Sequence, residues 1–150
     1  MRLSKKLLFA IEAVLDIAYH SADEPVQSKD IAERQGIPRR YLEPALQALV
    51  HANILRGVRG PRGGYRLARE RRKITVGDIV RVVQDKEGRN DPLEEPAGSD
   101  LGLAVLSPLW QELEEETMRR LDATTVEDLC RRAREAGVES RAQSQFDFMI

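Results

Sequence analysis

A six-residue run at positions 59–64, Arg-Gly-Pro-Arg-Gly-Gly, constrains the fold more than any other part of this chain. Its three glycines permit positive φ angles and therefore a tight reversal of the backbone. Short apolar patterns with strand character flank the run, at residues 54–58 before it and at residues 65–68 after it. The sequence therefore predicts a β-hairpin with this glycine-rich and arginine-rich run at its tip.

Two helical patterns open the chain. Apolar residues recur at helical spacing over residues 4–20, and Ser4 is a suitable N-cap for that helix. A short second helix is predicted over residues 29–35, with Ser28 as its N-cap. Gly36 fits the left-handed position that follows many helices, so the short helix should end in a tight turn.

A third helix is predicted from Pro38, which is tolerated in a first turn, to about Ala52. Pro44 lies inside it, where it removes the backbone hydrogen bond to the carbonyl of Arg40 and can bend the axis. A short helix, a turn containing glycine, a second helix and then a hairpin is the order of a winged helix-turn-helix. The predicted fold class is therefore mainly α, with a small β-hairpin wing.

The second half of the chain begins with a capping box. Thr75 and Asp78 have the spacing that caps a helix, here predicted over residues 76–84. Residues 85–100 then lose all apolar periodicity and contain two glycines, two prolines and six acids. This composition is typical of a linker loop.

A long helix is predicted over residues 101–121, with Ser107-Pro108 as a point where it can restart or kink. A last helix runs to about residue 136, with Thr124 or Thr125 as its cap together with an acid at position 127 or 128, and Gly137 stops it. The expected organisation is a winged helix-turn-helix domain over residues 1–84, a linker over 85–100, the long and short helices over 101–136 and a tail over 137–150.

The net charge of −1 hides a strong asymmetry between the two halves. Residues 1–75 hold 15 Lys and Arg against 8 Asp and Glu, a net +7, whereas residues 76–150 carry a net −8. Residues 56–73 hold eight basic side chains and one acid. A basic half joined to an acidic half indicates that the first half meets a polyanion.

The pattern contains no catalytic constellation. His20 and His51 fall at the ends of unrelated helices, without a nucleophile or a second ligand at a recognisable spacing. The single cysteine, Cys130, lies on an amphipathic helix, where we interpret it as a small buried hydrophobe. No apolar run is long enough for a membrane span, and Glu12 and Asp16 interrupt any signal-peptide core. We therefore expect a cytosolic protein that is not an enzyme.

The third predicted helix carries polar side chains near its N-terminus, the end that enters the major groove in helix-turn-helix proteins. Arginine can bond guanine through two donors, and glutamate can accept from cytosine. The hairpin tip suits the minor groove or flanking phosphates, as do basic or hydroxyl groups near helix starts. The predicted DNA contacts are Arg2, Lys5, Lys6, Ser28, Arg39, Arg40, Tyr41, Glu43, Arg59, Gly60 and Arg62.

A set of short motifs is spread along the chain. These motifs lie at residues 1–3, 30–37, 41–43, 58–68, 74–80 and 121–129, together with Leu109-Trp110. In these segments the chain resembles the Rrf-two family of winged-helix transcription regulators. The resemblance covers roughly residues 1–130, and the glycine-arginine wing in register with the other segments is its most specific part. It implies DNA contacts at Arg2, Ser28, Tyr41, Glu43 and Arg59.

The resemblance also implies a homodimer that binds an inverted-repeat operator and is held together by the long helix, here residues 103–121. The side chains that share one face of this helix are Leu106, Leu109, Trp110, Leu113, Thr117 and Leu121. Iron–sulfur members of the family carry three cysteines in and just beyond the loop that is residues 85–106 here, and this chain has none there. Thiolates are the chief ligands of such clusters, so we expect a cluster-free member without a cofactor.

The sequence thus favours a homodimeric DNA-binding transcription regulator, most simply a repressor. Three effectors stay open: a partner protein on the acidic half, a small molecule between the linker and the long helix, or a thiol event at Cys130. The alternative function is a winged-helix protein–protein interaction module, because a fold does not fix a function. Such a module would have little need of the arginines on both the wing and the third helix.

Overall fold

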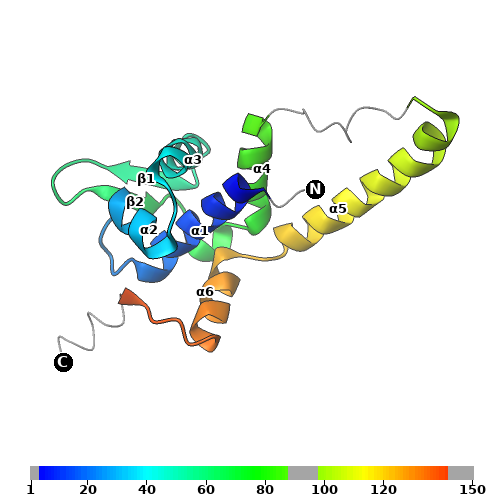
Figure 1. The fold of residues 1–150 in the computed structure, drawn as a ribbon. Helices are drawn as coiled ribbons and strands as arrows, with labels where there is room; N and C mark the ends of the chain where they lie inside the picture. The colour runs from blue at the N-terminus through cyan, green and yellow to red at the C-terminus, as the bar shows by residue number, and fades with distance from the viewer. Residues whose placement is uncertain (1–3, 88–97, 142–150) are drawn as a thin grey trace.

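The computed structural model describes residues 4–87 and 98–141, so predictions that fall on residues 1–3, 88–97 and 142–150, Arg2 among them, lie outside it. Most of the described chain is helical and its strands form one two-stranded hairpin (Figure 1), which confirms the predicted fold class. In chain order the elements are α1 (Lys5–His20), α2 (Ser28–Gln35), α3 (Arg39–His51), β1 (Leu55–Val58), β2 (Gly64–Leu67), the 3-10 turn η1 (Arg71–Lys73), α4 (Val76–Glu87), the π-helical turn η2 (Gly102–Leu106), α5 (Ser107–Asp122) and α6 (Val126–Glu135).

Helix α1 lies in the centre of the core. The Ser4 side chain accepts a hydrogen bond from the Leu7 N–H at 3.2 Å and caps the helix as predicted. Helices α2, α3, α4 and α6 and strand β2 all contact α1. Its inner face is closed by small and branched side chains, and Ala13, Val14 and Ile17 are completely buried. The helix can therefore serve as the common support of the helix-turn-helix, the wing and α6.

The turn between α2 and α3 follows the predicted glycine geometry but not the predicted caps. Gly36 has a φ of 64°, in the left-handed region. Helix α2 begins at Ser28 itself, and Gln27 occupies the N-cap without a side-chain cap bond, so the assignment of Ser28 as N-cap is wrong. Pro38 stands at the N-cap of α3 rather than in its first turn. Pro44 is exposed inside α3, where water can satisfy the carbonyl that loses its partner.

The wing is a short antiparallel hairpin whose register pairs Leu55 with Leu67 and Val58 with Gly64. A further bridge joins β2 to the loop before α2, because Val26 and Tyr65 exchange two backbone hydrogen bonds of 2.9 and 2.8 Å. Gly64 has a φ of 154°, and a Cβ there would lie 2.4 Å from the Val26 carbonyl oxygen. The hairpin can therefore approach this loop only with glycine at position 64.

Helices α4 and α6 start side by side, each from a capping box. The side chains and backbone N–H groups of Thr75 and Asp78 bond reciprocally at 3.0 Å, and Thr125 with Asp128 repeats the motif, which selects Thr125 from the two predicted caps. Thr75 and Thr125 also form an antiparallel bridge. Helix α4 continues to Glu87, beyond its predicted end at residue 84, so the predicted linker start at 85 is wrong.

The long C-terminal helix is continuous through the predicted break. Pro108 has no N–H, and the turn before it widens so that the Ser107 N–H bonds the Gly102 carbonyl, a π-helical spacing. Its C-terminal end is fixed to α4: the Arg81 guanidinium donates two hydrogen bonds, of 2.8 and 2.6 Å, to the Asp122 carboxylate. A Cβ at Gly77 would lie 1.9 Å from that carboxylate, so glycine permits this junction.

A substitution at Gly64 tests how the wing is attached. Gly64→Ala is expected to lower the free energy of unfolding by about 1–3 kcal/mol, because alanine is strained at this φ and collides with a backbone oxygen. Gly57→Ala is the matched control, since a Cβ at that position meets nothing within 4 Å. Urea unfolding of both variants measures the difference, and equal stability would contradict the proposed close approach.

Candidate nucleic-acid interface and the exposed face of α5

The N-terminus of α3 presents three neighbouring polar side chains to solvent. Arg39, Arg40 and Tyr41 are exposed, and the Arg40 guanidinium lies 4.8 Å from the centre of the Tyr41 ring. The same ring lies 6.0 Å from that of Phe9 on α1, which anchors it to the core. Glu43 is half-buried one turn further along. These contacts restrict where Tyr41 and Arg40 can point before any ligand is present.

The basic run of residues 56–73 divides into two parts that the sequence could not distinguish. In the first part, Arg56, Arg59 and Arg62 are exposed, and the structure gives them no ion-pair partner among residues 4–87 and 98–141. Gly60 shares the hairpin tip with them at a φ of 108°. These side chains keep their full donor capacity for an external anion.

The second part of the run is tied to the protein itself. The Arg69 guanidinium lies 3.8 Å from the Asp78 carboxylate, Arg71 pairs with Glu127 on α6, and Arg72 donates to Glu70 at 2.6 Å. This pairing lowers the pKa of Glu70. The two parts of the run therefore differ, because Arg69, Arg71 and Arg72 are already occupied by acids of the protein itself.

Residues that the sequence interpretation missed attach the wing to the helix-turn-helix. The Gln27 side chain donates to the Pro61 carbonyl at 3.4 Å, and the Arg66 guanidinium donates to the Asp23 carbonyl at 2.6 Å. Burial raises the pKa of the Tyr65 phenol and nearby Glu43 raises it further, while the Gln47 side chain of α3 partly opposes the shift. No periodicity signals such contacts, because they join residues distant in sequence.

A buried ion pair fixes α2 against α1. Asp16 is 2% exposed and accepts two hydrogen bonds from the Arg34 guanidinium, at 2.8 and 2.9 Å, and one from the Gln35 amide at 2.7 Å. The hydrogen bond with Asp16 raises the pKa of Arg34. Sequence reasoning treated Asp16 only as an interruption of an apolar stretch. Ser28, by contrast, is partly exposed at the start of α2, and Lys5 and Lys6 are exposed at the start of α1, where predicted phosphate contacts remain accessible.

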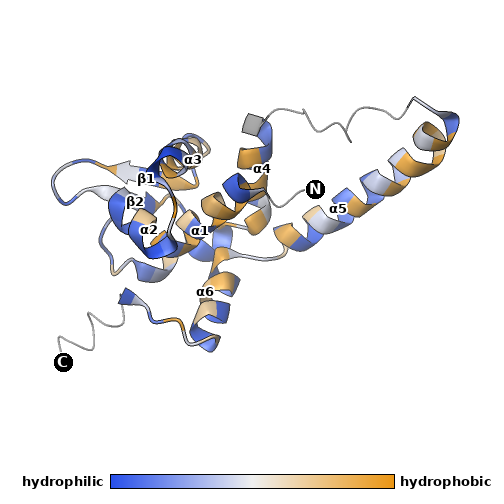
Figure 2. Cartoon of the chain, viewed as in Figure 1, coloured by the Kyte–Doolittle hydropathy of each residue, from blue (hydrophilic) through white to orange (hydrophobic). Residues whose placement is uncertain are grey.

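Helix α5 extends away from the winged domain (Figure 1), and hydrophobic residues recur along it (Figure 2). Trp110 is 53% exposed, and Leu106, Leu109 and Leu113 are exposed to a similar degree. Thr117 is also exposed, and its hydroxyl donates to the Leu113 carbonyl at 2.9 Å. Soluble chains rarely leave such a contiguous apolar surface open to water.

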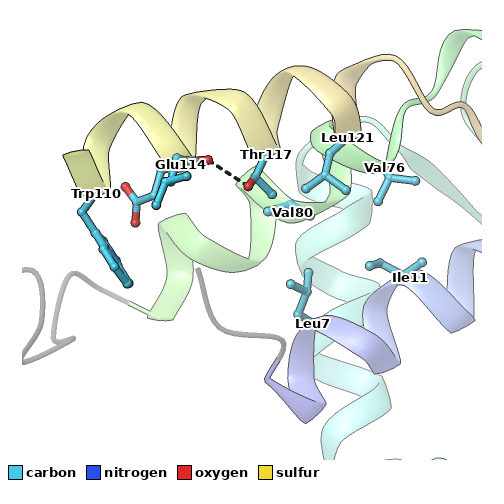
Figure 3. A pocket seen from close by; sticks show the side chains of 9 residues that line it. Leu7, Ile11, Val76, Val80, Trp110, Glu114, Thr117 and Leu121 are labelled. Atoms are coloured by element: carbon cyan, nitrogen blue, oxygen red, sulfur yellow. Dashed lines mark hydrogen bonds between the residues drawn. The ribbon is translucent and has the colours of Figure 1, made fainter. Parts of the chain in front are cut away.

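The same face borders a groove of about 320 Å³ between α5, α4 and the first turns of α1 (Figure 3). Leu121 is half-buried at one end of the groove, where it packs against the buried cluster of Leu7, Val76 and Val80. The full lining consists of Leu7, Ile11, Val76, Val80, Trp110, Leu113, Glu114, Thr117 and Leu121. The groove is thus mainly apolar, and it brings Trp110, Leu113, Thr117 and Leu121 of the predicted face together.

The described part of the chain does not assemble a metal or nucleophile site. Cys130 is fully buried on α6, as its interpretation as a small hydrophobe requires, and burial raises the pKa of its thiol. No group of three or more His, Cys, Asp or Glu residues within residues 4–87 and 98–141 could hold a metal ion. The single cysteine does not fit a thiolate-held cluster. No helix in these same ranges is both long and apolar enough to cross a membrane.

A winged helix-turn-helix with exposed arginines on the wing and the third helix has the layout of the winged-helix class of transcription regulators. A family model described as "Rrf2: Iron-dependent Transcriptional regulator" matches residues 3–132. The chain belongs to the Rrf2 family of transcriptional regulators.

Individual relatives agree with this assignment. The chain is 34% identical to Protein rrf2 of Nitratidesulfovibrio vulgaris over 89% of both chains, and 38% identical to the HTH-type transcriptional regulator IscR of Photobacterium profundum over 87% of this chain and 76% of that one. The solved structure of IscR from T. potens superposes with a TM-score of 0.75 at 34% identity, covering 93% of each chain. CymR, the global cysteine regulator of B. subtilis, gives a TM-score of 0.70 at 30% identity, covering 87% of this chain and 96% of that one. These relatives are regulators rather than enzymes.

Proposed function

We propose that the protein is a homodimeric, sequence-specific DNA-binding regulator that represses transcription from an inverted-repeat operator without an iron–sulfur cluster. The observation that carries the proposal is the division of the basic run. Arg59 and Arg62 on the wing have no ion-pair partner in the described chain, whereas Arg69, Arg71 and Arg72 are paired with acids. Within the run, the arginines that pair with no acid thus lie on the wing, where a winged helix meets DNA.

In the proposed complex, the N-terminus of α3 enters the major groove. Arg39 and Arg40 would donate to guanine or to phosphate, and Glu43 would accept from cytosine, while the Tyr41 hydroxyl would reach the backbone. Arg59, Gly60 and Arg62 at the hairpin tip would enter the minor groove or contact its phosphates. Arg2 and Ser28 would hold phosphates at the edges, the latter with the backbone N–H groups at the start of α2.

A second copy of the chain is the proposed partner of the exposed α5 face. Leu106, Leu109, Trp110 and Leu113 form an apolar surface next to the groove, and a two-fold pair of α5 helices would cover both copies at once. Thr117 and Leu121 would continue the contact toward the winged domain. Two-fold symmetry in the protein matches an inverted repeat in the operator.

The proposed absence of a cluster rests on this chain's own residues. Its one cysteine is enclosed by α6 and the core, and residues 98–106 contain no cysteine or histidine. Asp100 in that stretch is an exposed acid. Burial of Cys130 raises the pKa of its thiol and therefore disfavours a regulatory reaction at this thiol. The proposed effector is instead a partner protein or a small molecule.

Paired substitutions test the DNA-binding face. Arg40→Ala and Arg59→Ala are each expected to weaken binding to duplexes selected from a random pool by about 1–3 kcal/mol, roughly five- to 150-fold. Each lost phosphate contact should also reduce the magnitude of the salt slope by about 0.9. Arg72→Ala removes the same charge from the paired half of the run and should change affinity little. Equal effects of all three variants, or no enriched sequence, would favour the protein-interaction module instead.

Substitution of Leu113 tests the proposed pairing of α5 helices. Leu113→Glu is expected to convert the dimer to a monomer, because it places a charge in the centre of an apolar contact. Sedimentation velocity measures the change, with Leu8→Glu as the control at an exposed apolar residue of α1. A dimer that persists in Leu113→Glu at the same concentration would rule out this interface.

Anaerobic purification tests the cluster-free proposal. The protein is expected to be colourless and free of iron and sulfide, and to remain so after incubation with both, because one buried cysteine cannot supply the thiolate ligands. Visible absorption and iron content are the measurements. A brown protein with stoichiometric iron would overturn this part of the proposal.

A further inference from the structure

The segment that follows α6 turns back and lies against the C-terminal end of α1 (Figure 1). The Tyr19 hydroxyl donates to the Val138 carbonyl, and the Ser140 hydroxyl donates to the Tyr19 carbonyl at 2.6 Å. The Arg141 backbone N–H donates to His20 Nδ1 at 3.1 Å. Three hydrogen bonds between residues about 120 positions apart therefore hold residues 138–141 on the last turn of α1.

His20 lies between this segment and the buried ion pair of the helix-turn-helix. Its side chain is 10% exposed, and its ring meets the Tyr19 ring edge-on, with the ring centres 5.4 Å apart. On the opposite side, His20 Nε2 lies 4.0 Å from Asp16 Oδ2. The same oxygen accepts from Arg34 Nε and from Gln35 Nε2, at the end of α2. The Asp16 carboxylate thus faces both His20 and α2, the helix that precedes α3, which is the proposed DNA-recognition helix.

The hydrogen bond from Arg141 defines the protonation state of the ring. Nδ1 can accept only while it keeps its lone pair, so the imidazole must be neutral with its proton on Nε2, toward Asp16. A doubly protonated ring has donors at both nitrogens and cannot accept from a backbone N–H. Protonation of His20 therefore removes the last of the three hydrogen bonds.

We propose that residues 138–141 form a C-terminal clasp on α1, which neutral His20 closes and protonated His20 opens, and that Asp16 couples the clasp to α2. On protonation, the Nε2–H group becomes part of a cation beside Asp16 and competes with Arg34 and Gln35 for the carboxylate. Protonation of His20 would therefore open the clasp and alter the contacts of Arg34 and Gln35 at the end of α2 at the same time.

The charges around His20 give this switch its direction. Burial lowers the pKa of His20; Asp16 opposes that effect, while Arg34 and Arg141 add to it. The ring is therefore neutral, and the clasp closed, at neutral pH. Because the folded-state pKa lies below the ordinary histidine value of about 6.5, the stabilisation is complete above that pH and is lost as the pH falls through the folded-state value.

Nuclear magnetic resonance of the full-length wild-type protein between pH 8 and pH 5 tests the clasp. As the pH falls, the Arg141 amide is expected to lose about tenfold in protection from hydrogen exchange, after correction for the intrinsic pH dependence of exchange. The midpoint of this loss is expected to coincide with the midpoint of the His20 ring titration. The Arg34 Nε–H resonance is expected to shift at that same midpoint, which reports the coupling through Asp16.

Two variants separate the clasp from general acid sensitivity. In His20→Asn the side-chain oxygen can replace Nδ1 as acceptor and does not titrate, so Arg141 protection is expected to persist to pH 5. His51→Gln removes the exposed histidine at the end of α3 and is expected to leave the wild-type transition unchanged. Protection of Arg141 that does not change with pH in the wild type, or that is lost equally in His20→Asn, would overturn the proposal.

Discussion

The central packing of α1 is the constraint on which the rest of the structure depends. Four helices and one strand contact this helix, and its buried alanines allow them to approach closely. The helix also contributes the carboxylate of Asp16, which is desolvated and therefore costly unless it is fully bonded. Arg34 and Gln35 supply those bonds, so the position of α2 is set by electrostatics as well as by apolar contact. Because α3 follows α2 after a short turn, the fixed position of α2 also restricts the orientation of α3, the proposed recognition helix.

Local signals were sufficient for much of this architecture. The capping box of Thr75 with Asp78 and the left-handed Gly36 are encoded within a few residues, and both were predicted correctly. The glycine-rich hairpin was predicted for the same reason. The extension of α4 to Glu87 was missed, because the apolar pattern ends before the helix does. Sequence periodicity reports which face is buried and is a weaker guide to where a helix stops.

The features that sequence could not supply are those formed by residues far apart in the chain. The basic run divides into unpaired and paired arginines because Glu127 and Asp78 bind Arg71 and Arg69. These residues come close together only after folding. The link from Arg141 through His20 to Asp16 likewise joins the two ends of the described chain. The proposed DNA contacts and the proposed α5 interface remain at positions that periodicity and the family resemblance both indicate. Their exposure and their ion pairing, however, are visible only in the folded structure.

Helix α5 is fixed at its C-terminal end and extends from there as a rigid rod. Asp122 is clamped by Arg81 against Gly77, and the paired starts of α4 and α6 fix the backbone just beyond it. Helix α5 contains 16 residues, which corresponds to a rod of about 24 Å at 1.5 Å per residue. In the proposed dimer, this rod would set the distance between the two wings. Insertion of one helical turn would lengthen it by about 5 Å, so in the proposed dimer the length of α5 would set the spacing of the two operator half-sites.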